Sequence, residues 1–245
     1  MKKQTVSMGM LVKIQVTDSQ VTNEDINEVF ALFHYVDKKF STYKKDSEIS
    51  KINNGELKEK EFSNEMKRIL SLCEKTKQET DGYFDINVNG KLDPSGVVKG
   101  YAILAGAKLL QKKRLKNIYV EIAGDIQVFG KNNNENGWKI GIQNPFSPNE
   151  IIKAVCLSDR GIATSGNYQR GKHIINPIEN KMADEIASVT VIGPDILEAD
   201  RFATAAFAMG EKGIEFINNL NGFEGYMIRK DGKALFTAGF EKYTV

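Results

Sequence analysis

The sequence predicts an α+β fold in which mixed, largely antiparallel sheets pack against helices. Helical patterns are interspersed among short strand-like runs, and turn residues separate many of these runs as they do in hairpins. Of the 245 residues, 41% are apolar, which is enough for a substantial core. No repeat, linker or low-complexity tract divides the chain. We therefore expect a single domain spanning residues 1–245.

Three amphipathic helices are predicted in the first half of the chain. The first follows Thr22-Asn23-Glu24-Asp25, a helix-start signal, and carries apolar residues at helical spacing as far as Val36. The second extends from about Ser63 to Thr80 and the third from about Val98 to Gln111. A further helix contains Asp200 and follows a strand-like run.

The predicted strands alternate apolar and polar residues or form short apolar runs. Turn residues such as Asn132-Asn133-Asn134 and Asn144-Pro145 separate several of them. Asp231-Gly232 lies between two runs and is a strong hairpin signal. The predicted strands are Val12–Val16, Asn117–Gly130, Trp138–Ile142, Ile151–Leu157, Ser188–Ile192, Gly225–Arg229 and Ala234–Thr237.

Charge and hydropathy argue against a nucleic-acid partner and against a membrane segment. The 34 basic and 32 acidic residues are interspersed, so no basic stripe is present that could follow a nucleic-acid backbone. No apolar run approaches the roughly 20 residues that cross a bilayer, and Met1–Val6 lacks the apolar stretch of a signal peptide. We expect no nucleic-acid partner, no membrane segment and a cytoplasmic location.

Asp200 and Thr204 are candidate metal ligands. Residues four apart on a helix lie on one face, so a carboxylate and a hydroxyl can meet the same hard cation, and Mg²⁺ prefers such oxygen ligands. The alternative is purely structural: Asp200 caps the first helical turn, and the Thr204 hydroxyl bonds back to the helix backbone.

The chain contains no Gly-rich nucleotide-binding loop of the common kinds. The nearest segment is Gly96–Gly100, in which two glycines bracket Lys99 at the start of a predicted helix. Backbone N–H groups at a helix N-terminus favour an anion. The alternative is a tight loop with a solvated lysine.

Several short segments occur in the order typical of one protein family. They are Met8-Gly9, Phe40–Tyr43 with Asp46–Ser50 and Asn53, Gly82–Asp85, Leu92–Ala102, Ala123–Ile126, Ala163–Tyr168, His173–Pro177 and Ala199–Ala206. From Met8 to Gly210 the chain thereby resembles the ApbE family of FAD:protein FMN transferases.

The resemblance implies a flavin site. Tyr43 matches an aromatic residue that stacks on the isoalloxazine, and Tyr83-Phe84-Asp85 matches a stretch that lines the adenosine side. Lys99 falls near the cofactor, where a lysine can offset pyrophosphate charge. Taken alone, Tyr43 or Met8 would be interpreted as a core residue. The cofactor-binding residues that we predict are Met8, Tyr43, Tyr83, Phe84, Asp85, Asp93, Lys99, Ser165 and Ile174.

The resemblance also implies a metal site and a catalytic base. Mg²⁺ would be held by the Gly96 carbonyl, Asp200 and Thr204. Asp85 and Asp125, each at the end of a strand-like run, are additional acidic candidates, although either could instead bond loop amides. His173 and Asp200 are the predicted catalytic residues. A neutral imidazole can take a proton from a target hydroxyl, although His173 could instead bond a loop carbonyl.

Two positions depart from the family pattern. Asn176 stands where the family usually has aspartate, and Ala123 where it usually has glycine. Loss of the carboxylate beside His173 would remove a group that can orient the ring or raise its basicity.

The activity implied is Mg²⁺-dependent transfer of FMN from the substrate FAD to a threonine or serine hydroxyl of an acceptor flavoprotein, with release of AMP. The acceptor is expected to carry a flavinylation motif. Two alternatives are hydrolysis of FAD to FMN and AMP, and FAD binding without catalysis. Many family members are exported lipoproteins, so an extracytoplasmic location applies if a leader precedes this sequence.

Overall fold

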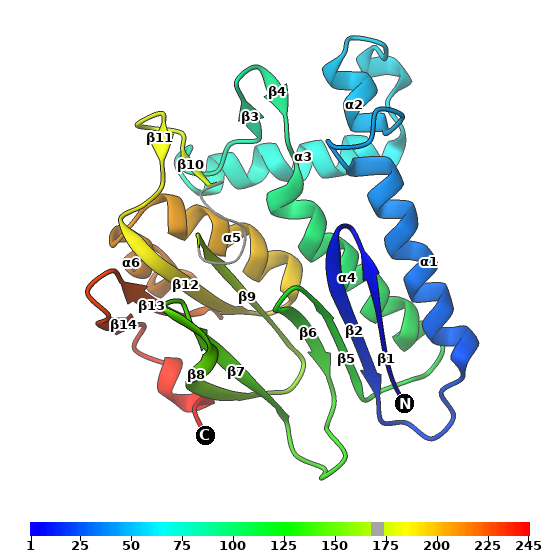
Figure 1. Ribbon diagram of the computed structural model, residues 1–245, viewed down its shortest axis with the longest axis vertical. Coiled ribbons are helices and arrows are strands. Elements are labelled where there is room, and N and C mark those ends of the chain that lie inside the picture. Colours follow the sequence, from blue (N-terminus) through cyan, green and yellow to red (C-terminus); the bar gives the residue numbers. More distant parts are fainter. Residues whose placement is uncertain (168–173) are drawn as a thin grey trace.

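A single eight-stranded sheet forms the centre of the computed structural model, which describes residues 1–167 and 174–245 (Figure 1). The strand order is β1-β2-β5-β6-β9-β12-β13-β14, and every neighbouring pair is antiparallel. The strands are β1 (Lys2–Ser7), β2 (Met10–Val16), β5 (Ile118–Ile122), β6 (Asp125–Phe129), β9 (Arg160–Gly166), β12 (Ile186–Gly193), β13 (Glu224–Arg229) and β14 (Ala234–Phe236). The predicted α+β class with antiparallel strands is confirmed.

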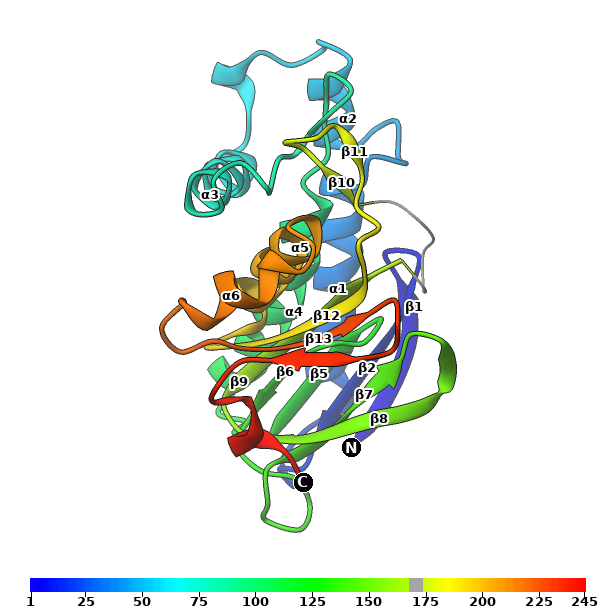
Figure 2. The same ribbon diagram turned by 90° about the vertical axis from the view of Figure 1, so that its left-hand side faces the viewer.

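Helices cover one face of this sheet (Figures 1 and 2). Helices α4 and α5 pack directly on the strands, whereas α1 and α3 pack against α4. The main apolar core lies between these layers and includes Val12, Val120 and Phe207. The helices are α1 (Asn23–Phe40), α2 (Glu48–Asn53), α3 (Asn64–Glu79), α4 (Ser95–Lys112), α5 (Ile196–Ala208) and α6 (Lys212–Asn218), with the short 3₁₀ helices η1 (Glu59–Glu61) and η2 (Phe240–Tyr243).

A long hairpin, β7 (Trp138–Asn144) and β8 (Ser147–Leu157), covers the opposite face of the sheet, as Figure 2 shows. A second apolar cluster fills the space between the hairpin, the sheet and η2, with Trp138, Val155 and Phe240 buried in it. Two smaller hairpins stand at one end of the molecule, β3 (Asn87–Val88) with β4 (Lys91–Leu92) and β10 (Ile175–Asn176) with β11 (Lys181–Met182).

Capping residues delimit the predicted helices. Thr22 forms a capping box with Asp25 at the start of α1, and the Ser63 hydroxyl accepts from the Met66 N–H at the start of α3. Helix α4 begins at Ser95 rather than at the predicted Val98, and Pro94 is its N-cap residue. Proline is tolerated at the start of a helix because an N–H there has no partner within the helix. No helix in the described part of the chain is long and apolar enough to span a bilayer.

The predicted strand Asn117–Gly130 is two strands joined by a tight turn. Ala123 and Gly124 both have positive φ, 49° and 90°, which is the backbone that a two-residue hairpin turn requires. Alanine is an unfavourable residue in the left-handed region, at about 1 kcal/mol or more, so Gly124 is the only local sign of this turn. The single-strand prediction was wrong for this reason.

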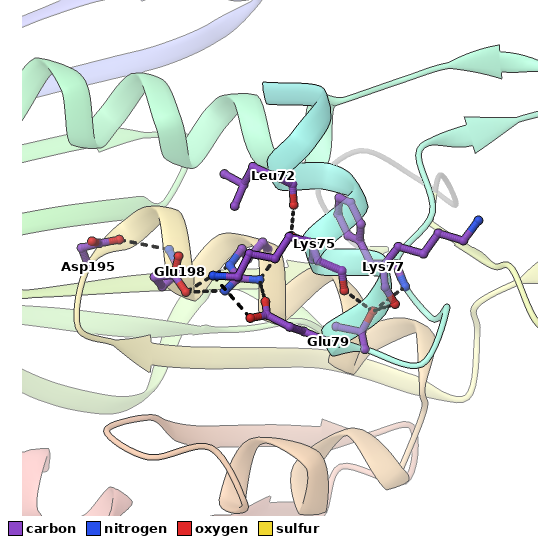
Figure 3. A network of polar contacts seen from close by, with 10 residues as sticks. Leu72, Lys75, Lys77, Glu79, Asp195 and Glu198 are labelled. Atoms are coloured by element: carbon purple, nitrogen blue, oxygen red, sulfur yellow. Dashed lines mark hydrogen bonds and ion pairs between the residues drawn. The ribbon is translucent and has the colours of Figure 1, made fainter. Parts of the chain in front are cut away.

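Arg201 anchors α5 to α3 through a buried polar network. Its guanidinium is 2% exposed and contacts Glu198 at 2.5 Å, the Thr76 hydroxyl at 3.2 Å and the Glu79 carboxylate. Figure 3 shows Glu79 and Glu198 converging from the two helices. The guanidinium also stacks over the Phe202 ring, 4.0 Å from its centroid. Arg201 thus holds the helix that carries Asp200 in place.

Replacing Arg201 by alanine should lower the free energy of unfolding by about 3 kcal/mol, because it removes several charge-assisted bonds and leaves a cavity. Urea denaturation would measure the change. Lys75→Ala is the matched control, since the Lys75 ammonium lies 3.5 Å from Glu79 on a side chain that is 61% exposed. That loss should stay below about 0.5 kcal/mol. Similar losses for the two variants would contradict the anchoring role.

Candidate functional site

A cavity of about 240 Å³ opens beside the N-terminal end of α4. Its walls come from the β3–β4 hairpin and the segment before it, the first turn of α4, the β5–β6 turn, the end of β9, the segment after residue 173, and α5. The lining residues are Tyr83–Asn89, Asp93, Ser95, Gly96, Lys99, Ala123, Thr164–Gly166, Ile174, Ile175, Pro177, Asn180, Asp200 and Thr204. Segments far apart in sequence therefore share one concave surface.

Two glycines allow α5 to approach α4 closely at this cavity. A Cβ on Gly100 would lie 2.9 Å from the Ile196 carbonyl oxygen and 3.0 Å from the Asp200 Cβ. A Cβ on Gly96 would lie 2.9 Å from the Phe84 ring and 3.4 Å from the Thr204 methyl. These glycines lie within α4, so the alternative of a tight loop was wrong. They serve close packing of two helices rather than a glycine-rich phosphate loop.

Asp200 faces α4 from the second turn of α5. Its carboxylate is 3% exposed and accepts a 2.8 Å hydrogen bond from the Gly100 N–H. In a regular α-helix this N–H pairs with the Gly96 carbonyl, so Asp200 competes with that carbonyl for the donor. Asp195 is the N-cap of α5, accepting from the Glu198 N–H at 3.0 Å. The alternative in which Asp200 caps the helix is therefore wrong.

Thr204 lies one turn after Asp200 and lines the same cavity. Its hydroxyl donates to the Asp200 carbonyl at 3.1 Å, which is the back-bonding expected of a threonine inside a helix. This bond uses the hydroxyl proton and leaves the oxygen lone pairs able to accept or ligate. The structural and the metal-binding interpretations of Thr204 are thus compatible.

Lys99 connects two buried carboxylates from different elements. Its Nζ lies 2.5 Å from Asp125 Oδ2 on β6 and 3.7 Å from Asp200 Oδ1 on α5. The lysine side chain is 17% exposed. The alternative of a solvated lysine is therefore wrong: Lys99 is mostly buried and its charge is balanced by Asp125, although it lines the cavity. Its contact with the cofactor stays a prediction.

The pKa of the Asp200 carboxyl is raised to about 7, chiefly by burial and in smaller part by the nearby Asp125 carboxylate. The Lys99 ammonium and the Gly100 N–H act in the opposite direction, because both stabilise the ionised form. Two carboxylates thus share one lysine in a site that water barely reaches. An additional cation would favour the ionised form of Asp200.

The predicted adenosine-side residues line the cavity wall next to α4. Phe84 is buried with its ring against the position of Gly96, and Tyr83 is half-buried. Asp85 is ion-paired with Lys77 at 2.7 Å. Asp93 accepts from the Ser95 N–H at 3.1 Å and so orients the first turn of α4. Ser165 and Ile174 also line the cavity.

Two predicted flavin contacts lie outside the cavity lining. Tyr43 is 97% exposed in the connection between α1 and α2. Met8 occupies the β1–β2 turn with φ 56° and packs partly against the core. Their contacts with a flavin stay predictions. His173 lies outside the described residues, and its role as the base also stays a prediction.

The sequence assigned no role to two residues that organise the cavity, Thr164 and Asn53. The Thr164 N–H, on β9, donates to Asp125 Oδ1 at 3.0 Å and orients that carboxylate. Asn53, on α2, bonds both backbone groups of Leu92, at 2.9 and 2.8 Å, and thereby holds the β3–β4 hairpin at the cavity rim. The resemblance included Asn53 and Asp125, but only the fold shows what they contact.

The raised pKa of Asp200 predicts a pH-dependent loss of stability in metal-free protein. The unfolded chain ionises this carboxyl near its ordinary value of 3.8, whereas the folded chain retains the proton until about pH 7. Stability therefore falls as pH rises from about 4 to 7.

Asp200→Asn keeps an acceptor for the Gly100 N–H and removes the charge. In EDTA at pH 8 it should be more stable than wild type by about 1–3 kcal/mol, since one pKa unit corresponds to about 1.4 kcal/mol. The difference should shrink towards pH 4. Urea denaturation at both pH values measures it, and an equal difference at both would contradict the assignment.

Comparison with known proteins agrees with this geometry. Residues 8–90 and 88–227 match the sequence model of the ApbE family. The FAD:protein FMN transferase of Haemophilus influenzae is 26% identical over 294 residues, which cover 92% of this chain and 84% of that protein. The FAD:protein FMN transferase of Escherichia coli strain K12 is 30% identical over 156 residues, 60% of this chain and 44% of that protein.

Solved structures share the fold. The ApbE protein of Thermotoga maritima has a TM-score of 0.90 at 22% identity, covering 100% of this chain and 99% of that one. The flavin transferase ApbE of Vibrio cholerae has a TM-score of 0.86 at 23% identity, covering 99% and 98%. With a family match along most of its length and the same fold, this chain belongs to the ApbE family.

Proposed function

We propose that this chain is an FAD:protein FMN transferase. It takes FAD as substrate, depends on Mg²⁺, and attaches FMN to a threonine or serine hydroxyl of an acceptor flavoprotein while AMP leaves. The main support is the convergence of Gly96, Asp200 and Thr204 on one cavity at a helix N-terminus. Membership of a family whose relatives carry this activity in their names supports the reaction type.

The donor set suits Mg²⁺. The residues that would hold the ion are Asp200, Thr204 and the Gly96 carbonyl, which are all hard oxygen donors. The described residues contain no cluster of three or more His, Cys, Asp or Glu side chains. A site of this kind needs none, because Mg²⁺ retains waters and shares substrate phosphate oxygens. When bound, the ion would neutralise charge on the pyrophosphate and act as a Lewis acid there.

The N-terminus of α4 suits the pyrophosphate. Its N-cap residue, Pro94, makes no side-chain capping bond and no acidic residue occupies the first turn, while Asp93, just before it, accepts from the Ser95 N–H. Ser95 and Gly96 line the cavity, so the positive end of the helix dipole is directed at it. Such a terminus binds anions through backbone N–H groups.

The reaction balances as a displacement at the FMN phosphorus. The acceptor hydroxyl oxygen forms the new phosphorus–oxygen bond, the bond to the AMP phosphate breaks, and the hydroxyl proton passes to His173. AMP departs with the bridging oxygen and its negative charge. Because little covalent chemistry falls to the protein, positioning and charge neutralisation supply most of the catalysis. Asp200, through the cation that it would hold, and the α4 terminus would position the pyrophosphate end, and Tyr83 and Phe84 would line the adenosine side.

Incubation with FAD and Mg²⁺, with and without a threonine-containing acceptor domain, tests this activity. We expect one AMP released for each acceptor that gains the mass of FMN less water, and EDTA should stop both. AMP release without a change in acceptor mass would identify an FAD pyrophosphatase. Stable FAD binding without AMP in either arm would identify a binding protein.

Asp200→Ala should reduce Mg²⁺-dependent transfer by about 10²–10³-fold, because it removes the only anionic ligand of the proposed set. The matched control is Asp231→Ala, in the exposed turn between β13 and β14. Control variant and wild type should transfer at the same rate. Normal turnover in Asp200→Ala would contradict the metal assignment.

His173→Ala should lower the transfer rate by about 10²–10⁴-fold, the usual contribution of a general base. Its effect on FAD affinity should be much smaller. Single-turnover transfer gives the rate, and quenching of flavin fluorescence gives the affinity. Equal losses in both would make His173 a binding residue.

A further inference from the structure

Lys99 has two carboxylates within reach but pairs closely with only one. Its Nζ lies 2.5 Å from Asp125 Oδ2, which is a direct ion pair. The distance to Asp200 Oδ1 is 3.7 Å, which is too long for a hydrogen bond. The Lys99 ammonium therefore makes no hydrogen bond to Asp200 Oδ1, although this oxygen is only slightly farther from it than Asp125 Oδ2 is.

Asp125 is held rigidly where it meets this lysine. It is 1% exposed and is the first residue of β6, directly after the Ala123-Gly124 turn. Strand β6 pairs with both β5 and β9, and Asp125 Oδ1 accepts from the Thr164 N–H at 3.0 Å. The second oxygen, Oδ2, makes no hydrogen bond within the described part of the chain and lies beside the Lys99 ammonium as an ion pair. The sheet thus places a buried negative charge next to a flexible lysine.

We propose that Asp125 is a positioning residue that holds the Lys99 ammonium away from Asp200 and so keeps the Asp200 carboxylate open to a divalent cation. This inference rests on the proposed function, which places the cation at Asp200. It assigns Asp125 a role through Lys99 rather than as a ligand.

Charge and geometry explain the need for such a residue. A lysine side chain has four flexible methylene groups, and opposite charges attract strongly where water is excluded. Without the Asp125 charge, the nearest carboxylate for Lys99 is Asp200. The ammonium would then occupy the same lone pairs that a cation needs, and its positive charge would repel the cation. Asp125 prevents this competition.

Mn²⁺ binding, measured from the electron paramagnetic resonance signal of free Mn²⁺, tests the proposal without any turnover. Asp125→Asn keeps the size of the side chain and an acceptor for the Thr164 N–H. It should bind Mn²⁺ about 10- to 100-fold more weakly than wild type, as losses of groups behind a metal ligand commonly do. Lys99→Met alone should bind at least as tightly as wild type. The double variant Asp125→Asn/Lys99→Met should return to wild-type affinity.

A second readout separates metal binding from catalysis. In Asp125→Asn the Mg²⁺ concentration for half-maximal AMP release should rise by the same factor, while the rate at saturating Mg²⁺ should recover most of the wild-type value. Circular dichroism and thermal unfolding of each variant verify that the fold is retained. A lower rate that Mg²⁺ does not restore would overturn the proposal.

The rescue by Lys99→Met decides between the roles of Asp125. If the double variant binds Mn²⁺ as weakly as Asp125→Asn, Asp125 is itself a ligand or a structural residue, and the proposal fails. It also fails if Asp125→Asn binds as tightly as wild type. Absence of Mn²⁺ binding in wild type would remove the metal site from the proposed function, and this inference with it. The two failures are therefore distinguishable.

Discussion

The close crossing of α4 and α5 is the constraint on which the candidate site depends. Gly100 leaves no side chain between the helices, so the α5 backbone reaches contact distance, and Gly96 leaves room for the Phe84 ring and the Thr204 side chain. At that distance Asp200 can accept the Gly100 N–H from inside the other helix. A side chain at Gly100 would separate the helices and withdraw Asp200 from the α4 terminus, whereas one at Gly96 would clash with the Phe84 ring. One packing condition thus brings the carboxylate, the Gly96 carbonyl and the Thr204 hydroxyl together.

Burial of the Asp200 charge costs folding free energy, and neighbouring contacts offset this cost. Asp200 loses its hydration, which is why its pKa is raised. Lys99 and Asp125 form an ion pair next to it, so the cluster carries one excess negative charge when all three groups are ionised. Arg201, the next residue of α5, faces the other way and anchors the helix to α3. Two adjacent residues therefore have different roles. Asp200 carries the buried charge of the candidate site, whereas the hydrogen-bonded charge of Arg201 stabilises the fold.

The central sheet supplies the other half of the site through its turns and strand ends. Ala123 of the β5–β6 turn and the end of β9 form part of the cavity wall, and pairing of β6 with β9 fixes Asp125 against the Thr164 N–H. The β3–β4 hairpin is too short to be stable alone. Asn53 substitutes for a neighbouring strand by bonding both backbone groups of Leu92. Loops that would otherwise vary in position are in this way tied to rigid elements.

Local signals were sufficient for the fold class and for helices α1, α3 and α4, whereas α2 was not predicted. Such features depend on periodicity, capping and turn chemistry, which neighbouring residues determine. Phe84 and Asp93 were predicted from the resemblance to the family, and Thr204 from its spacing to Asp200 as well. The turn at Ala123 was hidden, because alanine gives no sign of a left-handed backbone. The pairing of Lys99 with Asp125 and the exposure of Tyr43 were equally invisible. They arise from contacts between residues far apart in sequence, and only the packed helices and sheet decide which charges meet.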